Sequence, residues 1–392
     1  MNAISKQLFY EKVSSGVKCR NIHSWNQNCT KSQIWFVSTV FVGSLKFFLP
    51  IYIVKAIINS RRFKEKNFWL QLVLGQIRSS IYGTLMGSLF LAGNCLLCNL
   101  TGRLHYYNVS IVAGMFSGLS LLVETKENQT LDTLIFFNLL VEAFFRNFVN
   151  FNLPILTTGQ ETLLFMAVSS LLMFLLQSDQ TKKKLTNFWF YTPPKFSRKE
   201  NLDHNCVHEG FCADFALQGI QKYFLLGYGF GVVRKLIPSM LRVIRNPLAL
   251  LPIAFNKDNV KFGAFISAYV GVHRYFTCLL LKSNGVDQKY FGALAGLLAG
   301  ATYSISPNLQ VLTVGITTVL QILYHRLLKK LQVKNRLLPQ QLVYMLSHCL
   351  LLHNVMMCKE TCPTYYVNML NNATNNLFPQ VYDEVIGKYF PS

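Results

Sequence analysis

Cysteine and histidine residues gather in two polar segments of the chain, and each segment lies just before a long apolar run. The groups are Cys19, His23 and Cys29 in the first segment, and His204, Cys206, His208 and Cys212 in the second. Thiolates and imidazoles are the ligands that zinc prefers, and two neighbouring thiols can also form a disulfide. These residue types therefore indicate a metal site, a disulfide or plain thiols.

The spacing within the groups favours plain thiols. The second group offers four zinc ligands, but Cys206-x-His208 and Cys206-x5-Cys212 match no common zinc motif. Disulfides, pairing Cys19 with Cys29 and Cys206 with Cys212, would require an oxidising compartment. We therefore predict no metal and no cofactor, with zinc and disulfides as the open alternatives.

Other cysteines lie inside apolar runs, where a thiol usually packs as a small hydrophobic group. They are Cys95, Cys98, Cys278 and Cys349. We expect these four to belong to the packed interior.

The composition indicates a membrane protein built from helices. Of 392 residues, 51% are hydrophobic, only 14% are charged, and 31 are phenylalanine. The apolar runs give ten candidate spans, of which those of 16 to 18 residues are expected to be tilted, interfacial or re-entrant. The ranges are 34–58, 70–98, 106–123, 131–151, 161–176, 213–237, 260–281, 290–306, 309–328 and 341–357.

An internal repeat relates the two parts of the chain. Two apolar segments joined by a polar link recur about 180 residues apart, and small residues spaced by four recur in the second segment of each copy. Because apolar helices in lipid associate through small side chains that let their backbones approach, the glycines predict two hairpins closed by helix contacts. The predicted contact positions are Gly83, Gly87, Gly114, Gly118, Gly263, Gly292, Gly296 and Gly300.

The repeat predicts an all-α polytopic protein with two homologous halves of about four or five helices each. The halves span 34–176 and 204–362. A polar cysteine-containing segment, 1–33, precedes them, a linker, 177–203, joins them, and a tail, 363–392, follows.

Charged side chains within the apolar segments are candidates for a polar path. They are Lys46, Glu142, Arg146, His273 and Arg274. Charge inside a span is costly and normally faces a bundle interior or a water-filled cavity. The competing interpretation places Glu142 and Arg146, four residues apart, as an ion pair on an amphipathic helix.

The net charge of +21 lies mostly in the links between the apolar segments. Basic residues at helix ends attract anionic lipid headgroups, so the predicted partner is the lipid bilayer. Nucleic acid is not predicted as a partner, because no soluble basic domain with interleaved aromatic residues exists. The chain contains no phosphate-binding loop, zinc-protease motif or nucleophile elbow, so we predict that it is not an enzyme.

Several of these segments resemble the Transmembrane protein 135 family. The resemblance covers about 19 to 360 and rests on the runs Cys19 to Cys29, Ser44 to Tyr52, Asn205 to Cys212, Phe224 to Tyr228 and Phe255 to Phe265. The glycine-rich pairs are also similar, more distantly, to the Tim17/Tim22/Tim23 group of inner-membrane translocase subunits. The linker is shorter than the hydrophilic insert typical of the family.

The resemblance implies a multi-pass protein of the mitochondrial or peroxisomal membrane. It implies an influence on the balance of mitochondrial fission and fusion and on peroxisome and lipid homeostasis, with organelle-division proteins as candidate partners. The alternative hypothesis is a transporter or translocase-like pore with a polar path between the two repeats.

Overall fold

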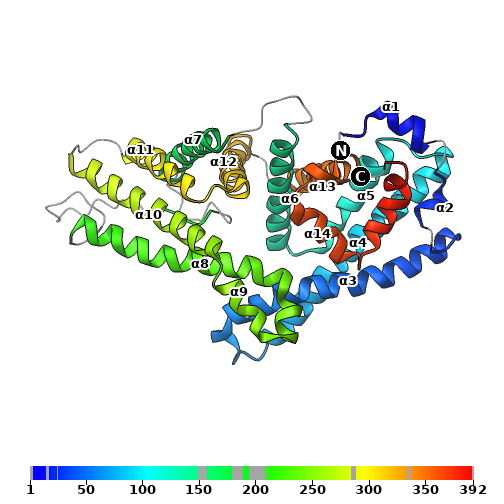
Figure 1. The fold of residues 1–392 in the computed structure, drawn as a ribbon, viewed down its shortest axis with the longest axis horizontal. Helices are drawn as coiled ribbons and strands as arrows, with labels where there is room; N and C mark the ends of the chain where they lie inside the picture. Colours follow the sequence, from blue (N-terminus) through cyan, green and yellow to red (C-terminus); the bar gives the residue numbers. More distant parts are fainter. Residues whose placement is uncertain are drawn as a thin grey trace. The chain divides into compact units, whose positions relative to one another are not determined.

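The computed structural model describes residues 3–14, 17–23, 25–148, 157–178, 189–193, 208, 210–283, 288–332 and 337–390. Within these ranges the chain is almost entirely helical and forms no strand (Figure 1). The predicted all-α class is therefore confirmed.

Five helices in the described ranges are long and apolar enough to cross a membrane. They correspond to five of the ten predicted spans. In the described part of the other five ranges, no helix combines the required length and hydropathy. For example, 106–123 is broken into π, α and 3₁₀ turns. The helices that qualify are α3 (Cys29–Ile58), α4 (Phe68–Thr101), α7 (Thr158–Ser178), α10 (Lys257–Ser283) and α12 (Leu309–Lys330).

The chain divides into two compact units. Unit 1 consists of Met1–Pro154 and Lys334–Ser392, and unit 2 consists of Ile155–Val333. Besides α3 and α4, unit 1 contains α1 (Lys6–Phe9), α2 (Cys19–Ile22), α5 (Ala113–Gly118), α6 (Lys126–Arg146), α13 (Leu337–Met357), α14 (Thr364–Ala373) and α15 (Leu377–Tyr382). Besides α7, α10 and α12, unit 2 contains α8 (Cys212–Arg245), α9 (Leu250–Ala254) and α11 (Gln288–Gly300).

Local sequence signals set several helix ends. The Asn28 side chain accepts hydrogen bonds from the backbone N–H groups of Thr30 and Lys31 and so starts α3. Thr125 caps α6 and Asn308 caps α12 in the same way. Helix α4 ends at Gly102, whose φ of 72° is readily adopted only by glycine.

The compact units group the helices differently from the two sequence halves. Helix α7, expected in the first half, packs on α11 and α12 in unit 2, and α13, expected in the second half, packs on α5 and α6 in unit 1. The boundaries at 176 and 204 are therefore not the boundaries of the compact units. The homology of the two halves stays a prediction.

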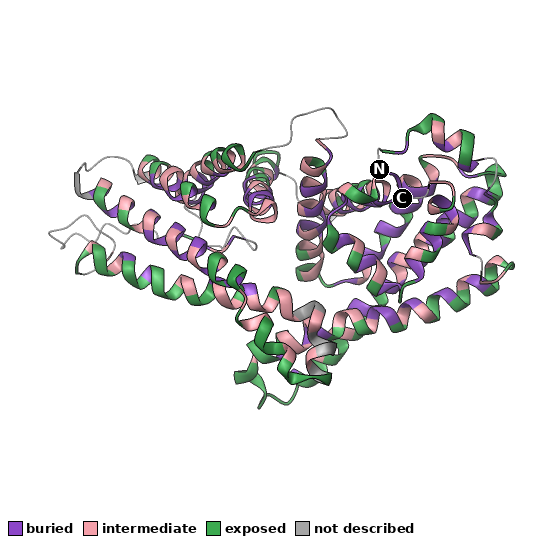
Figure 2. Ribbon diagram, in the orientation of Figure 1, coloured by how far each residue is buried: buried purple, intermediate pink, exposed green. Residues whose placement is uncertain are grey.

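Both chain ends take part in the core of unit 1, although the sequence indicated a polar segment and a tail. Phe9 and Val13 are fully buried near the N-terminus, and Val385 and Ile386 are fully buried near the C-terminus. Figure 2 shows buried stretches along the helices of unit 1. A backbone hydrogen bond of 3.0 Å from Ile4 to Met357 ties the N-terminal segment to the end of α13. Most of the predicted linker lies outside the described residues, but its Trp189 and Tyr191 are buried in the core of unit 2.

Glycines in unit 1 permit close contact between helices. Within the predicted hairpin, Gly93 on α4 faces Ala113 on α5, and other glycines face α3 and α13. A Cβ atom added at Gly83 would lie 2.8 Å from Ser44 Oγ on α3. One added at Gly114 on α5 would lie 2.8 Å from Cys349 Cα on α13. These glycines therefore join α4 to α3 and α5 to α13.

Further glycines and a serine extend these interfaces. Gly87 faces Val40 on α3, and Gly118 faces Met345 on α13. Ser117 lies beside Gly118 in the chain and donates a hydrogen bond to the Met86 carbonyl, while its Oγ lies 2.8 Å from His348 Nε2. Polar contacts between helices support such close approach in lipid.

Unit 2 contains the corresponding contacts. A Cβ atom at Gly300 on α11 would lie 2.5 Å from Met166 Cα on α7, and one at Gly296 would lie 2.9 Å from the Ser169 carbonyl. The Ser169 hydroxyl bonds to the Gly296 carbonyl at 2.7 Å. Helix α11 is thereby held tightly against α7.

The two remaining predicted glycines, Gly263 and Gly292, also lie in unit 2. Gly292 faces Gln177 near the end of α7, and Gly263 on α10 faces Phe224 and Tyr228 on α8. Of the hairpin partners, α10 therefore contacts α8 through its glycine, and α11 contacts α7 through its glycines.

We predict that alanine at Gly114 or Gly300 destabilises the protein by about 1–3 kcal/mol, because the added methyl group meets backbone that cannot move aside. Thermal or chemical unfolding in detergent measures the loss. Gly229→Ala is the matched control, because a Cβ atom there meets nothing within 4 Å. It should leave stability unchanged or raise it by up to about 1 kcal/mol. Equal stability of all three variants would contradict these interfaces.

Candidate metal centre

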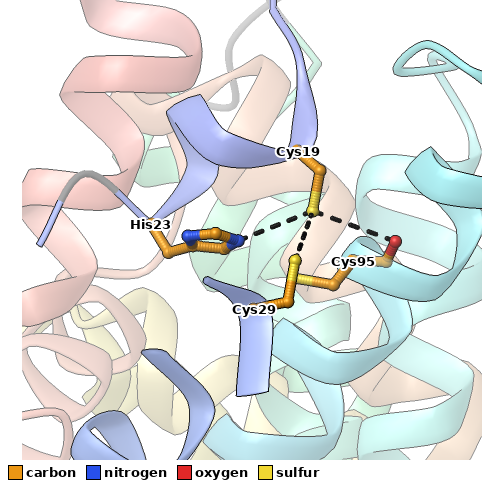
Figure 3. A group of neighbouring side chains, drawn as sticks. All are labelled: Cys19, His23, Cys29 and Cys95. Carbon is orange, nitrogen blue, oxygen red and sulfur yellow. Dashed lines mark hydrogen bonds between the residues drawn. The ribbon is translucent and has the colours of Figure 1, made fainter. Parts of the chain in front are cut away.

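Three segments of unit 1 bring four sulfur and nitrogen ligand atoms together. Cys19 and His23 come from α2 and the residue that follows it, Cys29 from the start of α3, and Cys95 from the body of α4 (Figure 3). The four ligand atoms lie within 4.8 Å of one another. Cys19 Sγ lies 3.6 Å from Cys29 Sγ and 3.6 Å from His23 Nε2.

The local sequence explains this convergence. Cys19 and His23 are four residues apart, and the helical turn between them places both on one face. The backbone N–H of Lys18 bonds to the Asn21 side chain and helps to start this turn. The Asn28 cap then places Cys29 in the first turn of α3.

A hydrogen bond fixes the orientation of the His23 ring. Nδ1 lies 2.7 Å from the Asn26 carbonyl oxygen. A carbonyl oxygen can only accept, so Nδ1 carries the proton, and in a neutral ring Nε2 keeps its lone pair. That lone pair faces Cys19 Sγ.

The cluster is shielded from solvent. His23 is fully buried, Cys19 and Cys95 are buried, and Cys29 is half-buried. Burial is the main cause that raises the pKa of the Cys19 thiol well above its usual value, and the neighbouring Cys95 and Cys29 thiols raise it further. Without a cation, Cys19 therefore stays protonated at neutral pH.

The arrangement can hold a metal ion or permit thiol oxidation. Three thiols and one imidazole point their ligand atoms at a common position, which is the composition of a closed tetrahedral site. The structure leaves Cys19 and Cys29, the residues of one predicted disulfide, as separate thiols.

A second cluster lies in unit 2. The ligand atoms of His208, Cys212 and Cys278 lie within 4.8 Å of one another. His208 Nε2 is 3.2 Å from Cys278 Sγ, and its ring stacks on Phe215 at 4.5 Å. The two other predicted ligands, His204 and Cys206, lie outside the described residues.

Sequence analysis assigned Cys95 and Cys278 to the packed interior and so missed their place in the clusters. Each lies in the long helix after the one that its cysteine and histidine segment precedes. The signal that could have identified them is a cysteine that recurs in the second long apolar run of each predicted half. Cys98, one turn beyond Cys95, is buried but is not among the clustered ligands.

The charged residues predicted to form one polar path each have local partners. Glu142 is buried in unit 1 and accepts two hydrogen bonds from Arg146 at 2.8 and 2.9 Å. Lys46 is exposed on α3, and its Nζ lies 3.4 Å from the Asn375 side chain.

In unit 2, Tyr191 OH lies 3.2 Å from His273 Nδ1. Arg274 donates a hydrogen bond of 2.9 Å to the Phe215 carbonyl and stacks on the Phe215 ring at 4.3 Å. His273 and Arg274 thus share Tyr191 as a neighbour. In unit 1, the partner of Lys46 is Asn375 and not the pair of Glu142 and Arg146.

Residues 17–149 match the family model described as the N-terminal cysteine-rich region of Transmembrane protein 135. The match contains all four members of the unit 1 cluster. It confirms the predicted resemblance to that family, whereas the resemblance to the Tim17/Tim22/Tim23 group stays a prediction. No solved structure matches the chain.

We predict that Arg146→Leu costs about 1–3 kcal/mol of stability, because the buried Glu142 carboxylate loses the hydrogen bonds of Arg146, whose own side chain is 37% exposed. The Glu142 side chain is only 1% exposed. The double variant with leucine at both positions should be more stable than Arg146→Leu alone, as measured by unfolding in detergent. A double variant no more stable than the single variant would show that the Glu142 charge is not buried.

Proposed function

Because the match over residues 17–149 supports membership of the Transmembrane protein 135 family, we propose that this chain is a non-enzymatic multi-pass protein of the mitochondrial or peroxisomal membrane. In this proposal it influences the balance of mitochondrial fission and fusion and the homeostasis of peroxisomes and lipids. The family resemblance supports the mitochondrial or peroxisomal location and the role in organelle dynamics and lipid homeostasis. The long apolar helices of the structure support a multi-pass membrane protein.

Residence in a membrane is supported by the outward faces of the apolar helices. Large apolar side chains are exposed along α3 and α4, including Ile34, Ile57, Leu70 and Leu74. In water such faces would favour aggregation, but in a bilayer they contact lipid tails. The five long apolar helices and the family match agree with a membrane protein.

The glycine contacts are the observation that best supports a scaffold. Gly114 and Gly118 hold α5 on α13, and Gly296 and Gly300 hold α11 on α7, at distances that leave no room for a methyl group. Most of the charged side chains within these units have a local partner or are exposed. Glu142 Oε2 and Arg274 Nε are buried atoms without a hydrogen-bond partner among the described residues. A transport path has less support, because it requires charges that face a shared interior.

Unit 1 also contains a small pocket with an apolar lining. Its walls come mainly from apolar residues, among them Phe36, Met86, Leu352 and Val385. Its cavity volume is about 40 Å³, which is too small for an acyl chain. The proposed role in lipid handling therefore rests on the family resemblance.

The loop between α3 and α4 supports contact with anionic lipids. Arg61, Arg62, Lys64 and Lys66 are all exposed there, and only Arg62 is paired, with Glu65 at 2.7 Å. Several cations at the ends of apolar helices attract negative headgroups. The same loop is the surface that we propose for organelle-division proteins.

We predict that cells lacking this protein show altered mitochondrial length and peroxisome number, and that the wild-type chain restores both. A variant with glutamine at Arg61, Lys64 and Lys66 should restore them only partly, because the loop loses its charge. Microscopy and organelle fractionation measure the effects, with Gly229→Ala as the neutral control. Unchanged organelles in the deleted cells, or a chain found in another membrane, would reject the proposed role.

We also predict that purified protein in phosphatidylcholine and cardiolipin liposomes passes no more ions or small solutes than empty liposomes. The reason is that Glu142 pairs with Arg146, Lys46 contacts Asn375, and Arg274 bonds to the Phe215 carbonyl. Solute flux is the measurement. Flux that disappears in folded Glu142→Leu or Lys46→Leu protein would instead establish the transporter hypothesis.

A further inference from the structure

The cluster of cysteine and histidine residues in unit 1 is not explained by the proposed function. We propose that Cys19, His23, Cys29 and Cys95 form a structural zinc site with all four positions filled by the protein. The site joins α2 and the start of α3 to the body of α4 (Figure 3).

The distances agree with a tetrahedral site. Zinc lies about 2.3 Å from thiolate sulfur and about 2.0 Å from imidazole nitrogen, so a tetrahedron places two sulfurs about 3.8 Å apart and sulfur and nitrogen about 3.5 Å apart. Here Cys19 Sγ lies 3.6 Å from both Cys29 Sγ and His23 Nε2. The four ligand atoms all fall within 4.8 Å.

His23 has the second interaction that a metal-binding histidine requires. Such a ring normally donates its other N–H to a carbonyl or carboxylate, which fixes its tautomer and direction. The 2.7 Å bond from Nδ1 to the Asn26 carbonyl does this. A histidine buried only for packing has no need to turn its lone pair toward three sulfurs.

A zinc ion would supply the positive charge that three thiolates require. Burial disfavours three thiolates at this position, but zinc compensates their charge and deprotonates coordinating thiols outright. Cys29 also lies in the first turn of α3, where the helix dipole favours a thiolate. Aromatic rings lie beside the cluster. The centroid of the Trp25 ring lies 6.4 Å from that of His23, and the Trp25 ring stacks on Phe36 with centroids 5.8 Å apart.

Three thiolates and one imidazole select zinc over harder cations. All four ligands come from the protein, so no position is left for a substrate. This composition is typical of a structural site rather than a catalytic one. Its effect is to anchor the short α2 helix, which has little packing surface of its own.

Metal content of the full-length chain tests the proposal. The protein is purified in detergent under reducing conditions, equilibrated with Zn²⁺, desalted and analysed by elemental mass spectrometry. Cys19→Ser and Cys95→Ser should each lose about one zinc ion per chain relative to wild type. Comparison with wild type removes any contribution from His208, Cys212 and Cys278.

Cys98→Ser is the matched control, because it changes a buried thiol one turn away on α4 that is outside the ligand set. It should keep the full zinc content. Equal zinc content in wild type and the Cys19 and Cys95 variants would overturn the proposal. Zinc lost from Cys98→Ser but not from Cys95→Ser would overturn the ligand set.

A second measurement avoids variants that fail to fold. Folded wild-type protein is alkylated with and without a zinc chelator, and each cysteine is followed by peptide mass spectrometry. Cys29, which is half-buried, should react slowly with zinc bound and at least several-fold faster after chelation. Identical rates, or a Cys19–Cys29 disulfide in protein isolated without reductant, would reject a zinc site.

Discussion

Close contact between helix backbones at glycine is the interaction on which both units depend. In a bilayer, apolar side chains gain little from packing against each other rather than against lipid, so helices associate where small residues let their backbones meet. Gly114 and Gly118 provide this meeting for α13, and Gly296 and Gly300 provide it for α7. Ser117 and Ser169 add hydrogen bonds at the same interfaces.

This constraint also explains why compact units differ from sequence halves. The groove along α5 is filled by Met345 and Cys349 of α13, and the groove along α11 is filled by Met166 and Met173 of α7. The last helix of each predicted half thus packs in the unit formed mainly by the other half. The spacing of the glycines indicated which helix faces are close-packed. It contained no information about which distant helix meets each face, because any apolar helix with a suitable ridge satisfies the same pattern.

The candidate site could be predicted only in part. Cys19, His23 and Cys29 could be singled out because they gather in a polar segment just before an apolar run. Cys95 lies within an apolar run and resembles a packing residue. A site built from both kinds becomes visible only when the start of α3 is placed beside α4. The charged residues could also be predicted only in part. Glu142 and Arg146 pair as their spacing indicated. Lys46 contacts Asn375 instead of joining this pair in a shared path. The proposed zinc site and the glycine contacts have a common effect. Both hold specific helices together in lipid, where the hydrophobic effect does not favour one helix partner over another.

Cysteine cross-linking between α5 and α13 tests this arrangement most directly. A Cβ atom at residue 118 lies 3.2 Å from Met345 Cβ, so a Gly118→Cys, Met345→Cys protein needs only a small shift to form a disulfide. Peptide mapping of the oxidised protein should find that bond. A Gly300→Cys, Met345→Cys protein should not form the equivalent bond, because Gly300 faces Met166. Cross-linking of the second pair and not the first would show that α13 packs with its own half, and would contradict the arrangement described here.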